Sequence, residues 1–130
     1  MRRRRNRRGF SLIEAVTGAM ILIPIALFLL DVTVLIIATT MNDTAVKNAA
    51  RAAANQPEGV EGFQAAQKSL NSFKSSALVK SLTLSKYDYP ASRDAVTCET
   101  KMVVALPVPI PGYDNITFLG RAVEPIVGNK

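Results

Sequence analysis

The sequence lacks histidine and tryptophan altogether, and Cys98 is its single cysteine among 130 residues. Without histidine, a tetrahedral Cys/His zinc site and a catalytic triad with an imidazole base are excluded. One cysteine also excludes an intramolecular disulfide, and we expect Cys98 to be a small apolar side chain in a core. The acidic residues show neither metal-loop spacing nor a neighbouring glycine-rich phosphate loop. The sequence therefore predicts no enzyme and no metal or cofactor site.

Positive charge is scarce outside the first eight residues. The formal net charge is +6, and the sixteen basic residues include six in this leader, namely Arg2, Arg3, Arg4, Arg5, Arg7 and Arg8. The ten other basic residues balance the ten acidic ones. A folded nucleic-acid-binding domain spreads lysine and arginine over a groove-sized surface, so this distribution argues against nucleic acid as a partner. The arginines instead favour a topology signal that stays in the cytoplasm.

A long apolar stretch runs from Phe10 to Ala38, and its interior from Ala15 to Leu30 contains no charge. As a helix, the whole stretch extends about 43 Å, whereas a bilayer core needs only about 20 apolar residues. The stretch is too long for a cleaved secretory signal, and the acidic Glu14 within it argues against a twin-arginine export signal. The sequence therefore predicts a transmembrane helix over residues 10–38, with the N-terminus inside and the C-terminus outside.

The start of this stretch carries the letters GFSLIE at residues 9–14, directly after the basic leader. This string resembles the processing site of type IV pilins and pseudopilins. The resemblance implies that a prepilin peptidase cuts after Gly9, which makes residues 1–9 a leader peptide and Phe10 the first mature residue. It also implies that Glu14, the fifth mature residue, guides assembly with other pilin subunits on an inner-membrane platform.

The chemistry of Phe10 and Glu14 agrees with this implied role. Cleavage frees an amine at Phe10, one helical turn from Glu14 and on the same helix face. Where many helices pack in a low dielectric, Glu14 can pair with the amine of a neighbouring subunit, and an unpaired carboxylate there is costly. We expect such a pair to hold subunits together and to set their axial register.

A second hypothesis stays open for the same residues. Glu14 can lie near the membrane interface, solvated by lipid headgroups and close to the arginines of the leader. The chain is then an uncleaved single-pass membrane anchor that carries a small periplasmic binding domain. The two hypotheses differ in whether Gly9 is a cleavage site and in whether Glu14 takes part in assembly.

A second resemblance involves the end of the apolar stretch. Asp31 closes the uncharged run, and residues 39–55 read TTMNDTAVKNAARAAAN. This pattern is similar to the TadE-like pseudopilins of tight-adherence (Flp-type) pilus systems. Together the resemblances imply a minor pilin or pseudopilin of a pilus or secretion machine, located first in the bacterial inner membrane and then in a pilus or pseudopilus at the cell surface. Pro24, inside the stretch, removes one helical hydrogen bond and is expected to bend or loosen the helix.

The helix is predicted to continue to Ala54, so that the long N-terminal helix covers residues 10–54. Met41, Ala45, Ala49 and Ala52 recur at spacings of three and four and form a narrow apolar stripe. The letters QPEG that follow are typical of a helix end.

Residues 55–130 are predicted to form a small α+β head with a second, short helix over Val60 to about Ser75. The apolar stripe of that helix consists of Val60, Phe63, Ala66, Leu70 and Phe73. Three antiparallel strands are expected at Leu78–Ser85, Ala95–Leu106 and Ile116–Glu124. Residues 87–93 are expected to be a loop, and the prolines of 107–112 a connection. So short a head holds only a thin core, which the stripe of the long helix is expected to complete.

Overall fold

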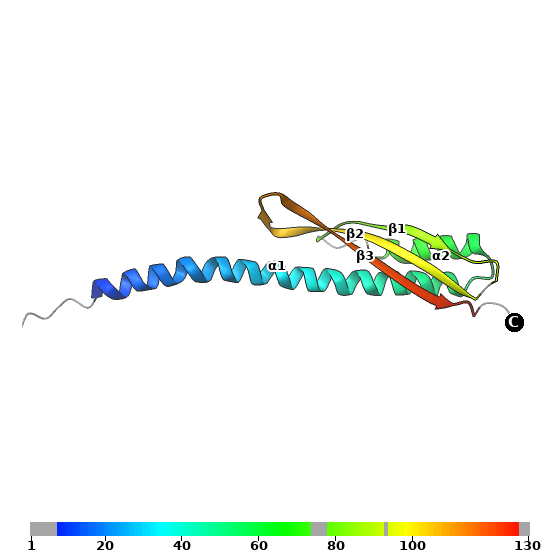
Figure 1. Ribbon diagram of the computed structural model, residues 1–130, viewed down its shortest axis with the longest axis horizontal. Helices are drawn as coiled ribbons and strands as arrows, with labels where there is room; N and C mark the ends of the chain where they lie inside the picture. Colours follow the sequence, from blue (N-terminus) through cyan, green and yellow to red (C-terminus); the bar gives the residue numbers. More distant parts are fainter. Residues whose placement is uncertain (1–7, 74–77, 93, 128–130) are drawn as a thin grey trace, which may run out of the picture.

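The computed structural model describes residues 8–73, 78–92 and 94–127. Within them, one long helix carries a small head of one helix and three strands on its C-terminal half (Figure 1). The elements are α1 Arg8–Ala54, α2 Gly59–Asn71, β1 Val79–Asp88, β2 Ala95–Ile110 and β3 Tyr113–Pro125. This arrangement confirms the predicted α+β class with a long helix, a short helix and a three-stranded antiparallel sheet.

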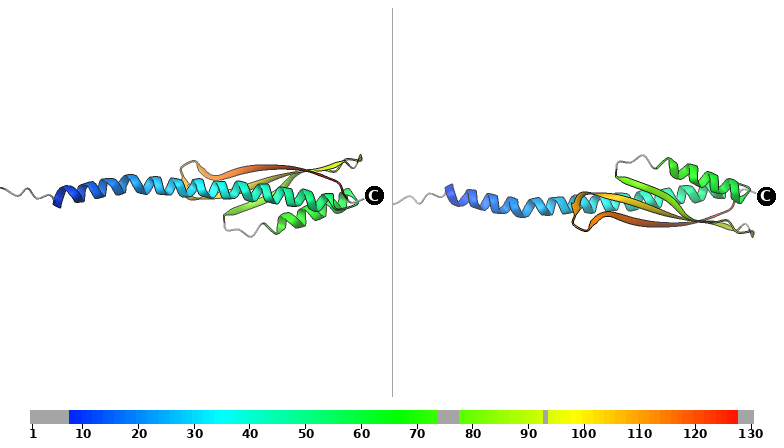
Figure 2. Two further views of the ribbon diagram at one scale, coloured as in Figure 1. Left: turned by 90° about the horizontal axis from the view of Figure 1, so that it is seen from below. Right: turned by 90° about the horizontal axis from the view of Figure 1, so that it is seen from above.

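The sheet has the order β1-β2-β3, and each strand pairs in antiparallel fashion with the next. The long helix α1 packs against β2 and β3 and also against α2, which in turn contacts β1. Figure 2 shows β3 on one side of α1 and α2 on the other. The C-terminal half of α1 is therefore the central element of the head.

The bounds of the helices differ slightly from the prediction. The first helix begins at Arg8 rather than Phe10, is continuous through Pro24, and ends at Ala54 as predicted. The second helix begins at Gly59 and ends at Asn71. It is therefore shorter than predicted, and the expected end near residue 75 lies outside the described residues.

The first loop of the sheet is shorter than predicted. Residues 87–93 were expected to be loop, but β1 continues to Asp88, and Tyr87 pairs with Cys98 in the ladder. A contact across the head explains the extension, because the Tyr87 hydroxyl donates a hydrogen bond of 2.9 Å to the carbonyl oxygen of Gly59 at the start of α2. The third strand likewise extends beyond its predicted range at both ends.

The connection predicted at residues 107–112 is wrong, because β2 runs on to Ile110 and only a two-residue turn separates it from β3. The pairing of β1 with β2 stops at Val104, and the ladder between β2 and β3 is irregular between Ala105 and Ile110. Prolines are tolerated at such a bulged hairpin end, where few ladder hydrogen bonds are required. Gly112, in the turn, has a φ of 89°, which favours glycine.

The core consists of the C-terminal half of α1 and the facing side of the sheet. Its fully buried α1 side chains are small, and they include Ala45, Val46, Ala49, Ala50 and Ala53. The face is therefore wider than the predicted stripe, and Met41 and Ala52 of that stripe are only half-buried. On the sheet, apolar side chains of β2 at alternate positions are buried, namely Val96, Cys98, Met102 and Val104.

The second helix faces α1 through Gly62, Ala66 and Leu70, all of which are buried. The predicted stripe is wrong at its start, since Val60 is 70% exposed and Phe63 is 39% exposed. The reason is a close approach at Gly62, where a Cβ would overlap the Tyr87 hydroxyl and lie 3.1 Å from a backbone oxygen of α1. Because glycine has no apolar side chain, a buried helix face centred on glycine does not appear in the apolar pattern of the sequence.

A polar pair joins α1 to β2 inside the core. Asn42 is 1% exposed and Thr100 is fully buried. The Thr100 hydroxyl donates to Oδ1 of Asn42 over 2.9 Å. Gly120 of β3 lies against this pair, and a Cβ there would come within 2.7 Å of Thr100 Oγ1 and 2.9 Å of Asn42 Nδ2. Glycine at position 120 therefore makes room for the hydrogen bond.

Candidate functional site

The N-terminal half of α1 has no cover from the head. From Ser11 to Leu30, every side chain is exposed apart from half-buried Gly18. The exposed side chains include large apolar ones, such as Met20 at 75% and Leu22 at 66%. Within the described residues, α1 is the helix that is long and apolar enough to cross a membrane. This is consistent with a single-pass membrane protein, and we call residues 11–30 the bare segment.

Glu14 lies in the bare segment and is exposed. It shares a shallow groove with Ile13, Thr17, Gly18 and Ile21. Among the described side chains, no hydrogen bond or ion pair involves Glu14. A carboxylate is thus presented on an apolar helix surface without a partner among the described residues of the head.

The other residues predicted for processing lie around the start of α1. The backbones of Gly9 and Phe10 belong to its first turns, which places residue 10 one turn before Glu14. The side chains of residues 8–10 lie outside the described part of the structure. Of the leader arginines, Arg8 is the first helical residue, and the others lie outside the described residues, namely Arg2, Arg3, Arg4, Arg5 and Arg7.

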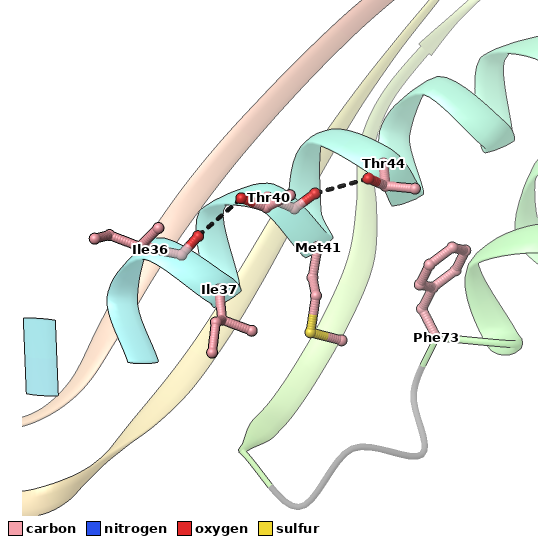
Figure 3. Close-up of a pocket in the computed structure, with 6 residues that line it drawn as sticks. All are labelled: Ile36, Ile37, Thr40, Met41, Thr44 and Phe73. Carbon is pink, nitrogen blue, oxygen red and sulfur yellow. Dashed lines mark hydrogen bonds between the residues drawn. The ribbon is translucent and has the colours of Figure 1, made fainter. Parts of the chain in front are cut away.

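The apolar surface of α1 continues past the bare segment on the side away from the sheet. Ile36 is 63% exposed and Ile37 is 47% exposed. With residues of the next two turns and Phe73, they line a shallow apolar groove between α1 and the end of α2 (Figure 3). The groove consists of Ile36, Ile37, Thr40, Met41, Thr44 and Phe73.

Four threonines of α1 donate their hydroxyl hydrogens to backbone carbonyl oxygens of the same helix. Thr40 Oγ1 donates to the carbonyl oxygen of Ile36 over 3.0 Å, and Thr44 Oγ1 donates to that of Thr40 over 2.8 Å (Figure 3). Thr33 and Thr39 make the same bond to the carbonyl four residues earlier, each over 2.8 Å. A hydroxyl satisfied within its own helix needs no water, so these threonines present a largely apolar surface.

Asp31 marks the point at which the head first covers α1. It is only 4% exposed, and its Oδ1 accepts a hydrogen bond of 3.2 Å from the backbone N–H of Val108. The sequence indicated Asp31 as the end of the uncharged run, but it gave no signal for this contact with β2. The carboxylate therefore holds the β2–β3 hairpin against the helix.

Two titratable side chains of the head, Cys98 and Tyr87, have pKa values raised by burial. Burial raises the pKa of the Cys98 thiol to about 11. The pKa of Tyr87 is raised to about 12, first by burial and then by the nearby Cys98 and Tyr89. The expectation that Cys98 is a core residue is confirmed, since it is fully buried. Among the described residues, no three histidine, cysteine or acidic side chains gather as metal ligands.

Comparison of the chain with protein-family models, with curated proteins and with solved structures finds no match. The features of the chain that bear on its function are therefore the motif at residues 9–14 and the contrast between the bare segment and the head.

Proposed function

We propose that this chain is a non-enzymatic, pilin-like structural subunit, a minor pilin or pseudopilin of a type IV or tight-adherence pilus or of a related secretion machine. A prepilin peptidase cuts it after Gly9, and the mature subunit enters an assembly through α1. Before assembly it is stored in the bacterial inner membrane, with the arginine leader in the cytoplasm and the head outside.

The observation that carries the proposal is the exposure of Glu14 in the bare segment. Glu14 lies near one end of the apolar stretch, and a carboxylate carried from there to the middle of a bilayer costs about 2.5–3.5 kcal/mol, so we expect it to pair with an opposite charge. The head supplies none among its described side chains. The amine that cleavage frees at Phe10 is a partner of the right charge, and the same helix in a second subunit presents it.

The shape of the molecule supports the same function. A subunit that packs side by side with copies of itself needs a helix that protrudes from its own head. Here α1 has 47 residues, and its residues 11–30 are exposed and extend beyond the head (Figure 1). Such a helix suits both storage in a membrane and packing in the centre of a fibre.

The test is the substitution Glu14→Leu, with Thr17→Leu as the matched control in the same groove. Glu14→Leu leaves the Phe10 amine of a neighbour without its partner, and breaking one side of a buried pair costs about 3–5 kcal/mol. We expect Glu14→Leu to insert and to fold its head, yet to lose more than about a hundredfold in co-purification with the fibre or with partner pilins. Thr17→Leu is expected to co-purify as the unsubstituted chain does, at equal membrane abundance.

Intact-mass measurement of the recovered chains completes this test. Both variants and the parent are expected to begin at Phe10, while a bulky residue in place of Gly9 leaves the precursor uncut in the inner membrane. Retention of Met1 in the membrane-bound pool, or unchanged co-purification of Glu14→Leu, would contradict the proposal. Either result favours the uncleaved membrane anchor with a small periplasmic binding domain.

A further inference from the structure

The end of the β2–β3 hairpin reaches back along α1 further than any other described part of the head (Figure 1). We call residues 106–113 the hairpin tip, and they read LPVPIPGY, with no charged residue among them. The tip is fixed to α1 by the hydrogen bond of 3.2 Å from the Val108 N–H to Asp31 Oδ1. It therefore lies directly beside the end of the bare segment.

The apolar surface of α1 extends past the level of the tip. Ile36 and Ile37 are exposed apolar residues that lie more than one helical turn beyond Asp31 in the direction of the head. Five to six residues of helix correspond to about 8 Å. A membrane that covers the exposed isoleucines therefore also reaches the hairpin tip on the other side of the helix.

The backbone of the tip is unusually poor in free hydrogen-bond donors. Pro107, Pro109 and Pro111 have no N–H group, and the N–H of Val108 is satisfied by Asp31. Ile110 is paired with Tyr113 across the turn. Free N–H groups are costly where lipid excludes water, and with so few of them this hairpin end can approach the apolar side of the headgroup layer.

Tyr113 supplies a suitable contact for a membrane interface. Its side chain is 67% exposed and has no aromatic or hydrogen-bond partner among the described residues. Tyrosine is enriched where a membrane meets water, because its ring is apolar while its hydroxyl needs a polar partner. Asp31 does not oppose this placement, since its carboxylate is covered and hydrogen-bonded.

We propose that the hairpin tip inserts into the headgroup layer of the same phospholipid membrane that α1 crosses, with Tyr113 at the interface. The subunit is then attached to the outer leaflet at two points, the helix and the hairpin. Two points of attachment fix the tilt and the rotation of the head above the membrane, which a single helix leaves free. This inference rests on the part of the proposed function that places α1 in a membrane.

Single-tryptophan variants test the inference in the full chain, because the sequence contains no tryptophan. Tyr113→Trp reports on the tip, and Leu22→Trp reports on the bare segment. Leu119→Trp is the matched control, since it lies on the same strand, is 76% exposed at present, and is about 20 Å further from the tip. Each variant is reconstituted in phosphatidylcholine vesicles, with and without bromine on the upper part of the acyl chains.

We expect the brominated lipid to quench Leu22→Trp and Tyr113→Trp and to leave Leu119→Trp unchanged, with a blue shift of Tyr113→Trp emission in vesicles of either kind. If Leu22→Trp is quenched and Tyr113→Trp is not, the tip does not touch the membrane although α1 spans it. A blue shift of Tyr113→Trp without quenching also overturns the proposal, because a protein surface then covers the tip. If Leu22→Trp is not quenched, the span itself fails, and the inference fails with it.

Discussion

The two halves of α1 contrast in the size of their apolar side chains. The bare segment consists largely of Leu, Ile, Phe and Met, and these large side chains are exposed. The half inside the head buries mainly alanine, and this permits α2 and the sheet to approach the helix backbone closely. Large apolar side chains suit a surface that packs against lipid or other helices, as proposed for the bare segment, while small ones suit the half that is packed in the head. One continuous helix serves both purposes because helical propensity is compatible with either kind of residue.

The largest expected difference between the two regions comes from the same substitution made in each. Leu82→Ala in β1 removes a fully buried side chain and is expected to lower the free energy of unfolding of the head by about 2–5 kcal/mol. Leu22→Ala in the bare segment removes a side chain that is 66% exposed and is expected to leave the stability of the head unchanged. Urea unfolding in micelles, followed by the near-ultraviolet circular dichroism of the tyrosines, measures both. An equal loss in the two variants would show that the halves fold as one unit.

Glycine-to-alanine substitutions are expected to change stability in opposite directions in the head and in the bare segment. Gly120→Ala places a Cβ against Thr100 and Asn42, and we expect an overpacking cost near the upper end of the usual range, about 3 kcal/mol. At Gly18 a Cβ meets nothing within 4 Å, so Gly18→Ala is expected to stabilise the helix by up to about 1 kcal/mol. Urea unfolding measures the first, and helical circular dichroism of the micelle-bound chain measures the second. A neutral Gly120→Ala would contradict the close packing of β3 on α1.

Threonine-to-valine substitutions are expected to give a smaller difference in stability between the head and the exposed part of α1. Thr100→Val leaves the buried Asn42 Oδ1 without its donor, and it is expected to cost about 1–2 kcal/mol. Thr33→Val in α1 removes only a bond to the helix's own carbonyl at an exposed position, so no change in the head is expected. The urea unfolding midpoints of the two variants, compared with that of the unsubstituted chain, measure both effects. Recovery of stability by combining Thr100→Val with Asn42→Leu would confirm that the cost arises from the unsatisfied oxygen.

Alkaline pH is expected to weaken the head and to leave the bare segment unaffected. Burial raises the pKa of Cys98 from 9.0 to about 11, so the folded head holds this proton more tightly than the unfolded chain. The resulting stability is complete below pH 9 and is lost as the pH rises through 11, with a loss of about 1 kcal/mol at pH 10. Tyr87, raised from 10.0 to about 12, extends the loss to higher pH. Urea midpoints from pH 8 to 11 measure the effect, and Cys98→Ala should flatten its lower part.

Much of the fold was predictable because periodicity and hydropathy are local signals. The end of α1 at Ala54 and the alternation of β2 follow from residues that are close in sequence. The prolines were misinterpreted because the rule against proline holds for a strand with two neighbours, whereas β2 extends beyond the end of β1. The buried face of α2 was misplaced because Gly62 allows α2 to approach α1 closely but adds no apolar side chain to the pattern.

The contacts that fix the head on α1 were not predictable from patterns. Thr100 was recognisable as a polar residue on an apolar face, but its partner Asn42 lies 58 residues away. Asp31 was recognisable as the end of the uncharged run, while its bond to Val108 spans 77 residues. Such pairs depend on the angle at which the sheet packs across the helix, and this angle cannot be predicted from a short stretch of sequence. The motif around Glu14, by contrast, lies within six consecutive letters.

The alanine face of α1 has a consequence for the biosynthesis of the head. Its α2 side is covered soon after α1 in sequence, but its sheet side is covered by β2 and β3, and the closing contacts at the end of α1, such as the bond of 3.3 Å from the Val127 N–H to the Ala54 carbonyl oxygen, come from late in the chain. In the proposed export of the head, the sheet-facing side of the helix is therefore expected to stay uncovered until β3 has been exported. Long-range closure of this kind is slow, and a waiting apolar surface invites aggregation. A face made of alanine exposes little apolar area during this delay, so the small side chains that let the finished head pack closely are also expected to protect the incomplete chain from aggregation.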